Sequence, residues 1–292
     1  IRHTPSSAAV ESCAFCLPME SAGKCRPLKK ENDLVIYNFF PTQESLQAKI
    51  LLHITFHLSQ DRNSLQFFGD EGNVNAMTDE RDVNLLSNLK FLVKEVCSDE
   101  IVSAATVLKI FSELYTFAES KSSKVTSVIS RALFAEIQKL PFVPTALPHL
   151  KKSPKDVLIW KDALLSCFSF KTSGHAEKYS KLKIASLAGQ EIIDHSEELR
   201  LFGAREVTSN DIGDIFDEIT ALKAPLNKEI KFANTNFKER KNIHEQIAHY
   251  IDDFSEENLK TIFKAPIFSE KEKQPVALDS DYYYFPPWEM LL

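Results

Sequence analysis

Glycine is scarce in this chain: it accounts for only 7 of the 292 residues. Loops that bind phosphate through backbone N–H groups need several glycines, because a Cβ keeps the backbone away from the phosphate oxygens. Neither G-x-G-x-x-G nor G-x-x-x-x-G-K-[ST] occurs in the sequence. We therefore do not expect this chain alone to bind a nucleotide through such a loop.

The chain also lacks an excess of positive charge and long apolar segments. Its formal net charge is -6, which does not indicate a basic surface for nucleic acid. No apolar run approaches the roughly 20 residues needed to cross a bilayer. The first six residues lack the apolar core of a signal peptide, and the missing initiator methionine suggests a trimmed product or an excised piece. Five cysteines, an odd number, predict free thiols in a reducing cytoplasm.

The signals for a metal site are weak. Cys13 and Cys16 have the C-x-x-C spacing of a zinc site, with Cys25 and His3 as further candidate ligands. The pair lies inside an expected strand, however, where residues three apart point to opposite faces. We interpret these cysteines as small buried thiols and expect no metal in this chain.

Histidines and catalytic motifs do not indicate an enzyme either. His53 and His57 share a strand face but lie roughly 13 Å apart, too far to chelate one metal. His244 and His249 miss the H-E-x-x-H spacing by one residue, which rotates the second histidine off the face of the first. No G-x-S-x-G occurs, and no pair of carboxylates is placed for acid–base chemistry. An enzyme acting by itself is the least supported interpretation.

The composition, 43% hydrophobic, allows a substantial core, and the length predicts about two domains. Prolines disfavour helix after Leu140, so we place the domain boundary there and expect domains 1–140 and 141–292. The expected fold class is α/β in the α+β sense, with a second, helix-rich module. Strands are expected near 8–17, 33–40, 49–58, 181–187 and 265–269, and helices near 85–96, 99–115, 125–140, 155–168, 210–222, 237–252 and 255–264.

Local signals refine this outline. We expect Pro41 to end the second strand, and the acidic pair Asp99 and Glu100 to begin the second helix. The segment from Thr208 to Asp211 is typical of a capping box. The aromatic tail at 281–288 has no helical or strand period, and we expect it to pack against the domain or a partner.

The strand at 49–58 is the most informative segment. Apolar residues alternate with His53, Thr55 and His57, which predicts one buried and one wetter face. The strand runs into Ser59-Gln-Asp-Arg62, so a guanidinium follows directly after a rigid element. Arg62 is suited to bind phosphate or carboxylate through two hydrogen bonds. The alternative is an arginine in an ordinary surface salt bridge.

The order of these segments resembles a known family. Asp33-Leu-Val-Ile-Tyr-Asn-Phe-Phe-Pro-Thr42 precedes a strand that ends in Phe56-His-Leu-Ser-Gln-Asp-Arg62, and Asn84-Leu-Leu-Ser-Asn-Leu89 follows. The series is similar to the region just after the ATP-binding domain in the sacsin and NO VEIN-like branch of GHKL ATPases, relatives of the ninety-kilodalton heat-shock chaperone. Leu58, Ser59 and Arg62 match the L-S-x-x-R pattern of that branch, whereas the intervening Gln60-Asp61 departs from the chaperone itself.

The resemblance covers residues 8–140 and extends more loosely over 141–292. In the second half it depends on Leu140-Pro-Phe-Val-Pro-Thr145, Ser153-Pro-Lys-Asp-Val157 and Leu199-Arg-Leu-Phe-Gly203. It implies that 1–140 is a transducer-like middle domain and that 141–292 is an interaction or coupling module. The order of the motifs carries the resemblance, since each motif is short.

The resemblance also implies a function. In GHKL ATPases a preceding domain binds ATP and Mg, and the transducer domain contributes a basic residue to the γ-phosphate. Arg62 is the candidate for that contact, with Ser59, Asp61 and Gln66 shaping its loop. This chain alone would bind no cofactor and hydrolyse nothing. Its expected partners are the N-terminal ATPase domain, a protein client and, in the full-length protein, a second copy, with no membrane.

Two other classes of function stay open. The chain is a stand-alone interaction or scaffold module if Arg62 has only a structural role. An enzyme of unrecognised type is the last alternative. A substitution at Arg62 distinguishes the first two, because only a nucleotide contact makes ATP turnover depend on this side chain.

Overall fold

The computed structural model of the chain describes residues 2–5, 12–18, 25, 27, 35–38, 40–45, 48–60, 63–66, 80–119, 125–147, 149–160, 167–170, 179–222, 230–233, 237–248, 250, 253–265, 268–269 and 275–276.

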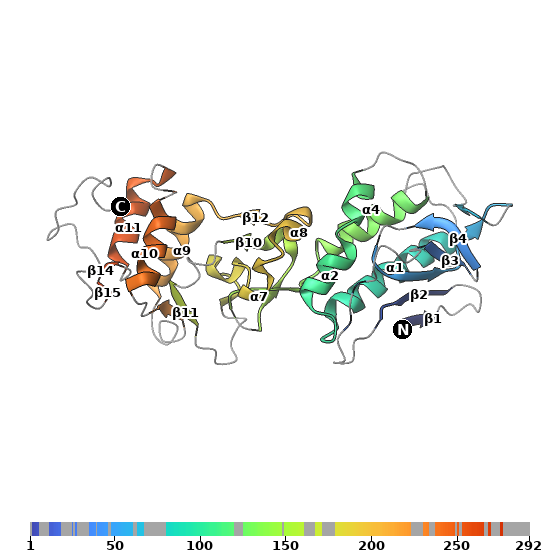
Figure 1. Ribbon diagram of the computed structural model, residues 1–292, viewed down its shortest axis with the longest axis horizontal. Helices are drawn as coiled ribbons and strands as arrows, with labels where there is room; N and C mark the ends of the chain where they lie inside the picture. The colour runs from blue at the N-terminus through green and yellow to red at the C-terminus, as the bar shows by residue number, and fades with distance from the viewer. Residues whose placement is uncertain are drawn as a thin grey trace. The chain divides into compact units, whose positions relative to one another are not determined.

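The described residues form two compact units, and each contains pieces from distant parts of the sequence. Unit 1 comprises 1–143, 153–156 and 195–204, and unit 2 comprises 144–152, 157–194 and 205–292. Both units combine helices with small sheets (Figure 1). The expected fold class, mixed α+β, is therefore confirmed. The division into domains 1–140 and 141–292 stays a prediction, because compactness alone does not show that a segment folds independently.

Unit 1 is built on a five-stranded sheet with the strand order β1-β2-β5-β3-β4. Neighbouring strands are antiparallel except β3 and β5, which are parallel. Most of the alternating apolar residues of the 49–58 segment are buried as expected: Ile50, Leu52, Ile54 and Phe56 are each at most 3% exposed, whereas Leu58 is half-buried. Thr55, expected on the wetter face, is instead buried. The strands are β1 (Arg2–Pro5), β2 (Ser12–Cys16), β3 (Val35–Asn38), β4 (Phe40–Ser45) and β5 (Leu51–Ile54).

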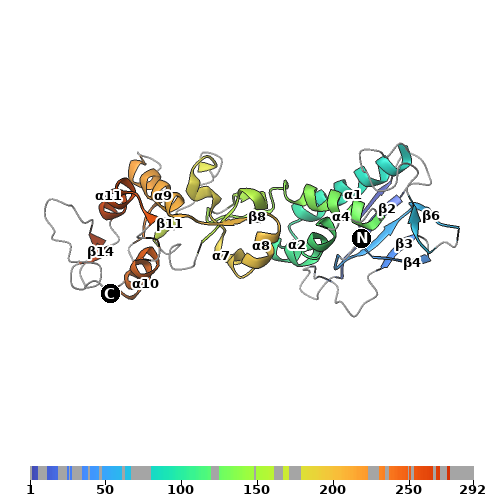
Figure 2. The ribbon, with the colours of Figure 1, turned by 90° about the horizontal axis from the view of Figure 1, so that it is seen from above.

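Two details of the expected strands are wrong. The segment 49–58 is not one strand: β5 ends at Ile54, and β6 (His57–Leu58) pairs instead with β7 (Leu65–Gln66) in a separate sheet. Pro41 does not end a strand but lies inside β4, the edge strand, where a missing N–H group is tolerated. Figure 2 shows β6 on the same side of the unit as β3 and β4.

Helix α1 (Glu80–Ser98) packs against β1, β2 and helix α4 (Val125–Ile137). Its expected apolar stripe is confirmed, since Leu85, Leu89 and Val93 are fully buried. The other helical segments of the unit are α2 (Ala104–Phe111), α3 (Leu114–Ala118), the 3-10 helix η2 (Pro154–Asp156) and α8 (Ser196–Leu201).

The expected start of the second helix is wrong. Helix α2 begins at Ala104, and the N-cap residue Ser103 accepts a hydrogen bond from the Thr106 N–H at 3.2 Å. Asp99 lies in the preceding turn, where its carboxylate accepts from the Ile101 N–H at 2.9 Å. An aspartate that satisfies a nearby N–H in this way favours a turn over a helix start.

The core of unit 2 is largely aromatic. The ring of Phe168 lies 5.7 Å from those of Trp160, Phe216 and Phe232. These side chains join the pair β11–β13 to helix α9, as apolar and edge-on ring contacts allow.

The described elements of unit 2 are β9 (Lys151–Lys152), β10 (Leu158–Ile159), β11 (Phe168–Phe170), η3 (Lys183–Ser186), α7 (Gln190–Ile193), β12 (Arg205–Glu206), α9 (Ser209–Ala221), β13 (Ile230–Phe232), α10 (Phe237–Ala248), α11 (Glu256–Lys264), β14 (Phe268–Ser269) and β15 (Pro275–Val276). Strand β8 (Val143–Pro144) contains the last residue of the first segment of unit 1 and the first residue of unit 2.

Helices α9, α10 and α11 agree with the expected helices, and the capping box at Thr208 and Asp211 is confirmed. The helix expected near 155–168 is wrong in its described part, because Leu158 and Ile159 pair with β12 as a parallel strand. The strand expected near 181–187 is the 3-10 helix η3. Of the last expected strand, β14 is described, and the aromatic tail at 281–288 lies outside the described residues.

Candidate functional site: a closed hairpin neck and an ion-pair cluster

The segment that leads to Arg62 is a short hairpin in unit 1. Strands β6 and β7 pair in an antiparallel register, His57 with Gln66 and Leu58 with Leu65. The hairpin packs against α4, and Leu65 is 4% exposed. The hairpin therefore has one buried anchor below its loop.

Ser59 and Ser64 lie opposite each other where the chain leaves β6 and returns to β7, and we call this part of the hairpin its neck. The Ser59 N–H donates to the Ser64 carbonyl at 2.9 Å. The Ser59 hydroxyl accepts from the Ser64 N–H at 3.1 Å and donates to the Ser64 carbonyl at 3.2 Å. A hydroxyl that both donates and accepts here holds Ser59 and Ser64 together.

The loop is also tied to the large sheet. The Gln43 N–H of edge strand β4 donates to the Asn63 carbonyl at 2.9 Å. An edge strand exposes unpaired N–H groups, and this contact satisfies one of them. The hairpin is thus closed at its neck, and Asn63 is bound to the large sheet.

The candidate residues from the sequence are only partly described. Arg62 and Asp61 lie outside the described residues. Ser59 lies in the hairpin neck, and Gln66 is exposed on β7. The structure therefore brings Ser59 and Gln66 into the hairpin that carries Arg62, and the roles of all four residues stay predictions.

The cysteines are free thiols, and Cys13 and Cys16 lie in β2. Among the described residues, no group of three or more His, Cys, Asp or Glu side chains is placed to hold a metal ion. Burial raises the pKa of the Cys97 thiol to about 12 and raises that of Cys167 as well. These two thiols stay protonated near neutral pH, and a protonated thiol is a poor nucleophile.

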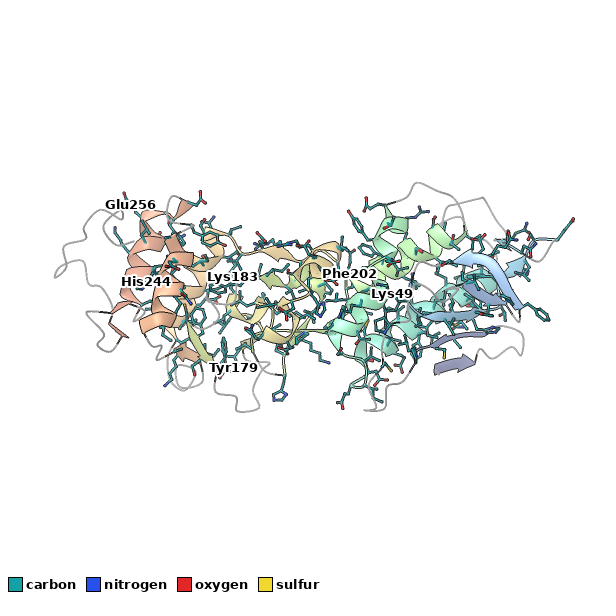
Figure 3. All side chains as sticks on the ribbon, in the orientation of Figure 1. Lys49, Tyr179, Lys183, Phe202, His244 and Glu256 are labelled. Carbon is teal, nitrogen blue, oxygen red and sulfur yellow. The ribbon has the colours of Figure 1, made fainter. Side chains whose placement is uncertain are left out.

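The densest polar cluster in the described part of the chain lies in unit 2, around Asp211. Its side chain is 3% exposed. Arg205 donates two hydrogen bonds to it, at 2.5 and 2.9 Å, and the Lys183 Nζ lies 2.9 Å from the Asp211 Oδ1. Lys183 is labelled in Figure 3. The Thr208 N–H and hydroxyl also donate to this carboxylate, at 2.9 and 2.7 Å. One buried carboxylate thus joins η3, β12 and the start of α9.

These contacts shift the pKa values of the cluster. Burial alone would raise the pKa of Asp211, but hydrogen bonds from Arg205, Lys183 and Thr208 outweigh it and hold this pKa far below its usual range. Burial alone would lower the pKa of Lys183, but Asp214 and Asp211 outweigh that effect and raise it. Asp211 and Lys183 are therefore held in their charged forms.

Glu218 behaves differently. Its two carboxylate oxygens accept the Lys183 N–H at 2.9 and 2.7 Å. Burial raises the pKa of Glu218 more than these hydrogen bonds lower it, and the nearby charge of Asp214 acts in the same direction as burial. Glu218 thus joins the start of η3 to α9 through hydrogen bonds. Its negative charge is unfavourable in this position.

An open depression of about 580 Å³ lies beside this cluster. Its lining is of mixed charge and comprises Lys152, Lys181, Leu182, Lys183, Ser186, Asp214, Asp217 and Glu218. Within this lining, three lysines face three carboxylates, so the depression has no excess of either charge. It therefore does not select an anion or a cation by charge alone.

Ser186 and Lys152 are the nearest approach to a catalytic pair in the depression. The Lys152 ammonium donates to the Ser186 hydroxyl at 2.8 Å. An ammonium that donates to a hydroxyl does not act as a base toward it. The next two N–H groups, of Leu187 and Ala188, already donate to backbone carbonyls and cannot bind an oxyanion. We interpret the pair as a structural contact between β9 and η3.

Sequence reasoning found only part of this cluster. The capping box pointed to Thr208 and Asp211, because its spacing is local. No local spacing points to Lys183, Arg205 or Glu218 as partners, since these contacts depend on how η3 and β12 pack against α9. The isolated basic and acidic residues of the sequence gave no signal of it.

Comparison with known protein families, curated proteins and solved structures finds no match. The resemblance to the sacsin-like ATPases therefore stays a prediction from the sequence. Within the described helices, none combines the length and the apolar character required to span a bilayer.

Proposed function

We propose that this chain is the coupling segment of a chaperone-like GHKL ATPase. It transmits the ATP state of a preceding N-terminal domain to a bound client or partner. The observation that carries the proposal is the closed neck between Ser59 and Ser64, the described residues on either side of the segment that contains Arg62, on a packed hairpin. A closed neck supports the proposal because a residue that must meet a phosphate at a defined position needs a rigid attachment.

In this proposal Arg62 contacts the γ-phosphate. A guanidinium offers two parallel donors and a permanent charge, both of which stabilise the negative charge of phosphoryl transfer. Ser59, Asp61 and Gln66 shape the loop. The preceding domain supplies the ATP and Mg sites, so the chain by itself hydrolyses nothing. The proposed location is the cytoplasm, and the full-length protein forms a homodimer.

The first test is the coding sequence upstream of Ile1, followed by ATP turnover of the full-length product. We expect a GHKL domain upstream, and a loss of turnover of roughly 10³-fold in Arg62→Ala, the range measured for phosphate-contacting arginines. Arg200→Ala is the matched control, because the Arg200 side chain is 38% exposed and pairs with Glu197 within the same helix, α8. A start codon just before Ile1, or unchanged turnover in Arg62→Ala, overturns the proposal.

The second candidate is a stand-alone interaction module. Exposed aromatic side chains on unit 1 favour it: Phe40 is 75% exposed on β4, and Phe91 is 48% exposed on α1. Exposed aromatics are enriched at protein interfaces. If Phe40→Ser and Phe91→Ser abolish binding to a partner while Arg62→Ala has no effect, the interaction module is the better account.

A further inference from the structure

Asn38 makes a buried contact at the base of the Arg62 hairpin. It is the last residue of β3 and is 6% exposed. Its side-chain amide donates to the Phe56 carbonyl at 2.6 Å. Phe56 lies in the two-residue gap between β5 and β6, where the chain leaves the large sheet for the hairpin.

The contact replaces a backbone hydrogen bond at the point where the sheet ends. The parallel pairing of β3 with β5 joins Ile36 to Leu52 and Tyr37 to His53. Beyond Ile54 the β5 chain is no longer in strand conformation, and the Asn38 amide binds it two residues further on. A buried carbonyl needs a donor, and the Asn38 amide supplies one.

Asn38 thereby completes the attachment of the hairpin neck, the part between Ser59 and Ser64. The Asn38–Phe56 bond holds the base of the hairpin, the Ser59–Ser64 bonds close its neck, and the Gln43 N–H binds the Asn63 carbonyl beside it. We propose that Asn38 is a positioning residue that sets where this neck stands on the large sheet. The placement of the neck follows from the contacts, and its consequence for ATP turnover through Arg62 rests on the function proposed above.

The first test is amide hydrogen exchange in the 292-residue chain. We expect Asn38→Ala to speed the exchange of the Ser64 and Gln43 amides roughly tenfold, since one buried hydrogen bond is lost. Asn38→Ser keeps a donor and restores part of the protection, and it also serves if the alanine variant does not fold. Thr145→Val is the control, because it removes comparable buried hydrogen bonds in unit 2. Unchanged exchange at Ser64 and Gln43 overturns the inference.

The second test is ATP turnover of the full-length protein. Asn38→Ala should lower kcat and leave the KM for ATP unchanged, because the preceding domain binds the nucleotide. Asn38→Ser should recover part of kcat, which a general loss of stability does not predict. The two proposals can fail separately. If Asn38→Ala speeds exchange but neither Asn38→Ala nor Arg62→Ala changes turnover, the proposed function is refuted. The placement of the hairpin neck by Asn38 is then still supported.

Discussion

Arg205 and Asp211 form a two-bond ion pair across six residues of sequence, with N–O distances of 2.5 and 2.9 Å. The carboxylate belongs to the first turn of α9 and also accepts both donors of its capping residue, Thr208. Lys183 of η3 approaches the same carboxylate. Asp211 therefore has two roles: it caps a helix, and it neutralises two cations from neighbouring elements.

We predict that Asp211→Asn destabilises the protein by about 1–3 kcal/mol, because the buried network loses its negative charge and one of its two acceptor oxygens. Urea unfolding measures the change. Asp214→Asn is the matched control: Asp214 also pairs with Lys183, but its side chain is 56% exposed, and we expect less than about 1 kcal/mol. Equal losses in the two variants would contradict a special role for Asp211.

Glu218 and Asp211 should give pH dependences of opposite sign. The lowered pKa of Asp211 gives stability that is present above the unfolded pKa of about 3.9 and is lost as the pH falls toward the folded value. The raised pKa of Glu218 means that its protonated form favours the folded state, so this contribution is lost as the pH rises through the folded pKa.

The pKa of glutamate in the unfolded chain is about 4.3, and above this pH the wild-type protein should lose stability as Glu218 ionises. We therefore predict that Glu218→Gln does not show this loss. The amide oxygen still accepts the Lys183 N–H, and no buried charge remains. Unfolding free energies measured from pH 4 to pH 8 test this. The variant should gain relative to the wild type as the pH rises, and a constant difference would show that Glu218 does not titrate in this way.

Gly213 allows α9 and α11 to approach closely. A Cβ at this position would lie 2.4 Å from the Asn258 Cγ. Alanine in a helix normally stabilises by about 1 kcal/mol relative to glycine, but here we predict a net loss because the Asn258 side chain must move. Thermal unfolding of Gly213→Ala measures it. The double variant Gly213→Ala/Asn258→Ala removes the clash and should recover the loss, and failure to recover would place the cause elsewhere.

Ser59 should control access to the loop that carries Arg62. Ser59→Ala removes the hydroxyl that bonds the Ser64 N–H and carbonyl, and we predict that trypsin cleaves after Arg62 about fivefold faster, as loss of one hydrogen bond of about 1 kcal/mol implies. Ser64→Ala is the control, because Ser64 takes part in these bonds through its backbone. Equal cleavage of both variants would show that the Ser59 hydroxyl does not hold the neck.

The helices show where local sequence suffices. The stripe of Leu85, Leu89 and Val93 predicted α1, and the spacing of Thr208 and Asp211 predicted the start of α9. In both places the deciding interactions join residues within one or two helical turns. The alternation from Ile50 to Phe56 likewise predicted the buried face, but not where the strand ends.

The errors occur where distant partners decide. Leu158 and Ile159 have an apolar pattern that fits a helix or a strand, and pairing with β12 makes them a strand. β5 ends at Ile54, and a side chain from β3, Asn38, binds the chain beyond it. Neither contact has a signature in local spacing.

The sequence by itself determined the periodic helices, the capping box and the mixed α+β class, because these follow from spacing along one element. The tertiary structure alone decided that Lys183, Arg205 and Asp211 meet, and that Asn38, Gln43 and Ser59 hold one hairpin. Residues far apart in the chain have no fixed distance until the elements pack, so these contacts are a property of the folded molecule.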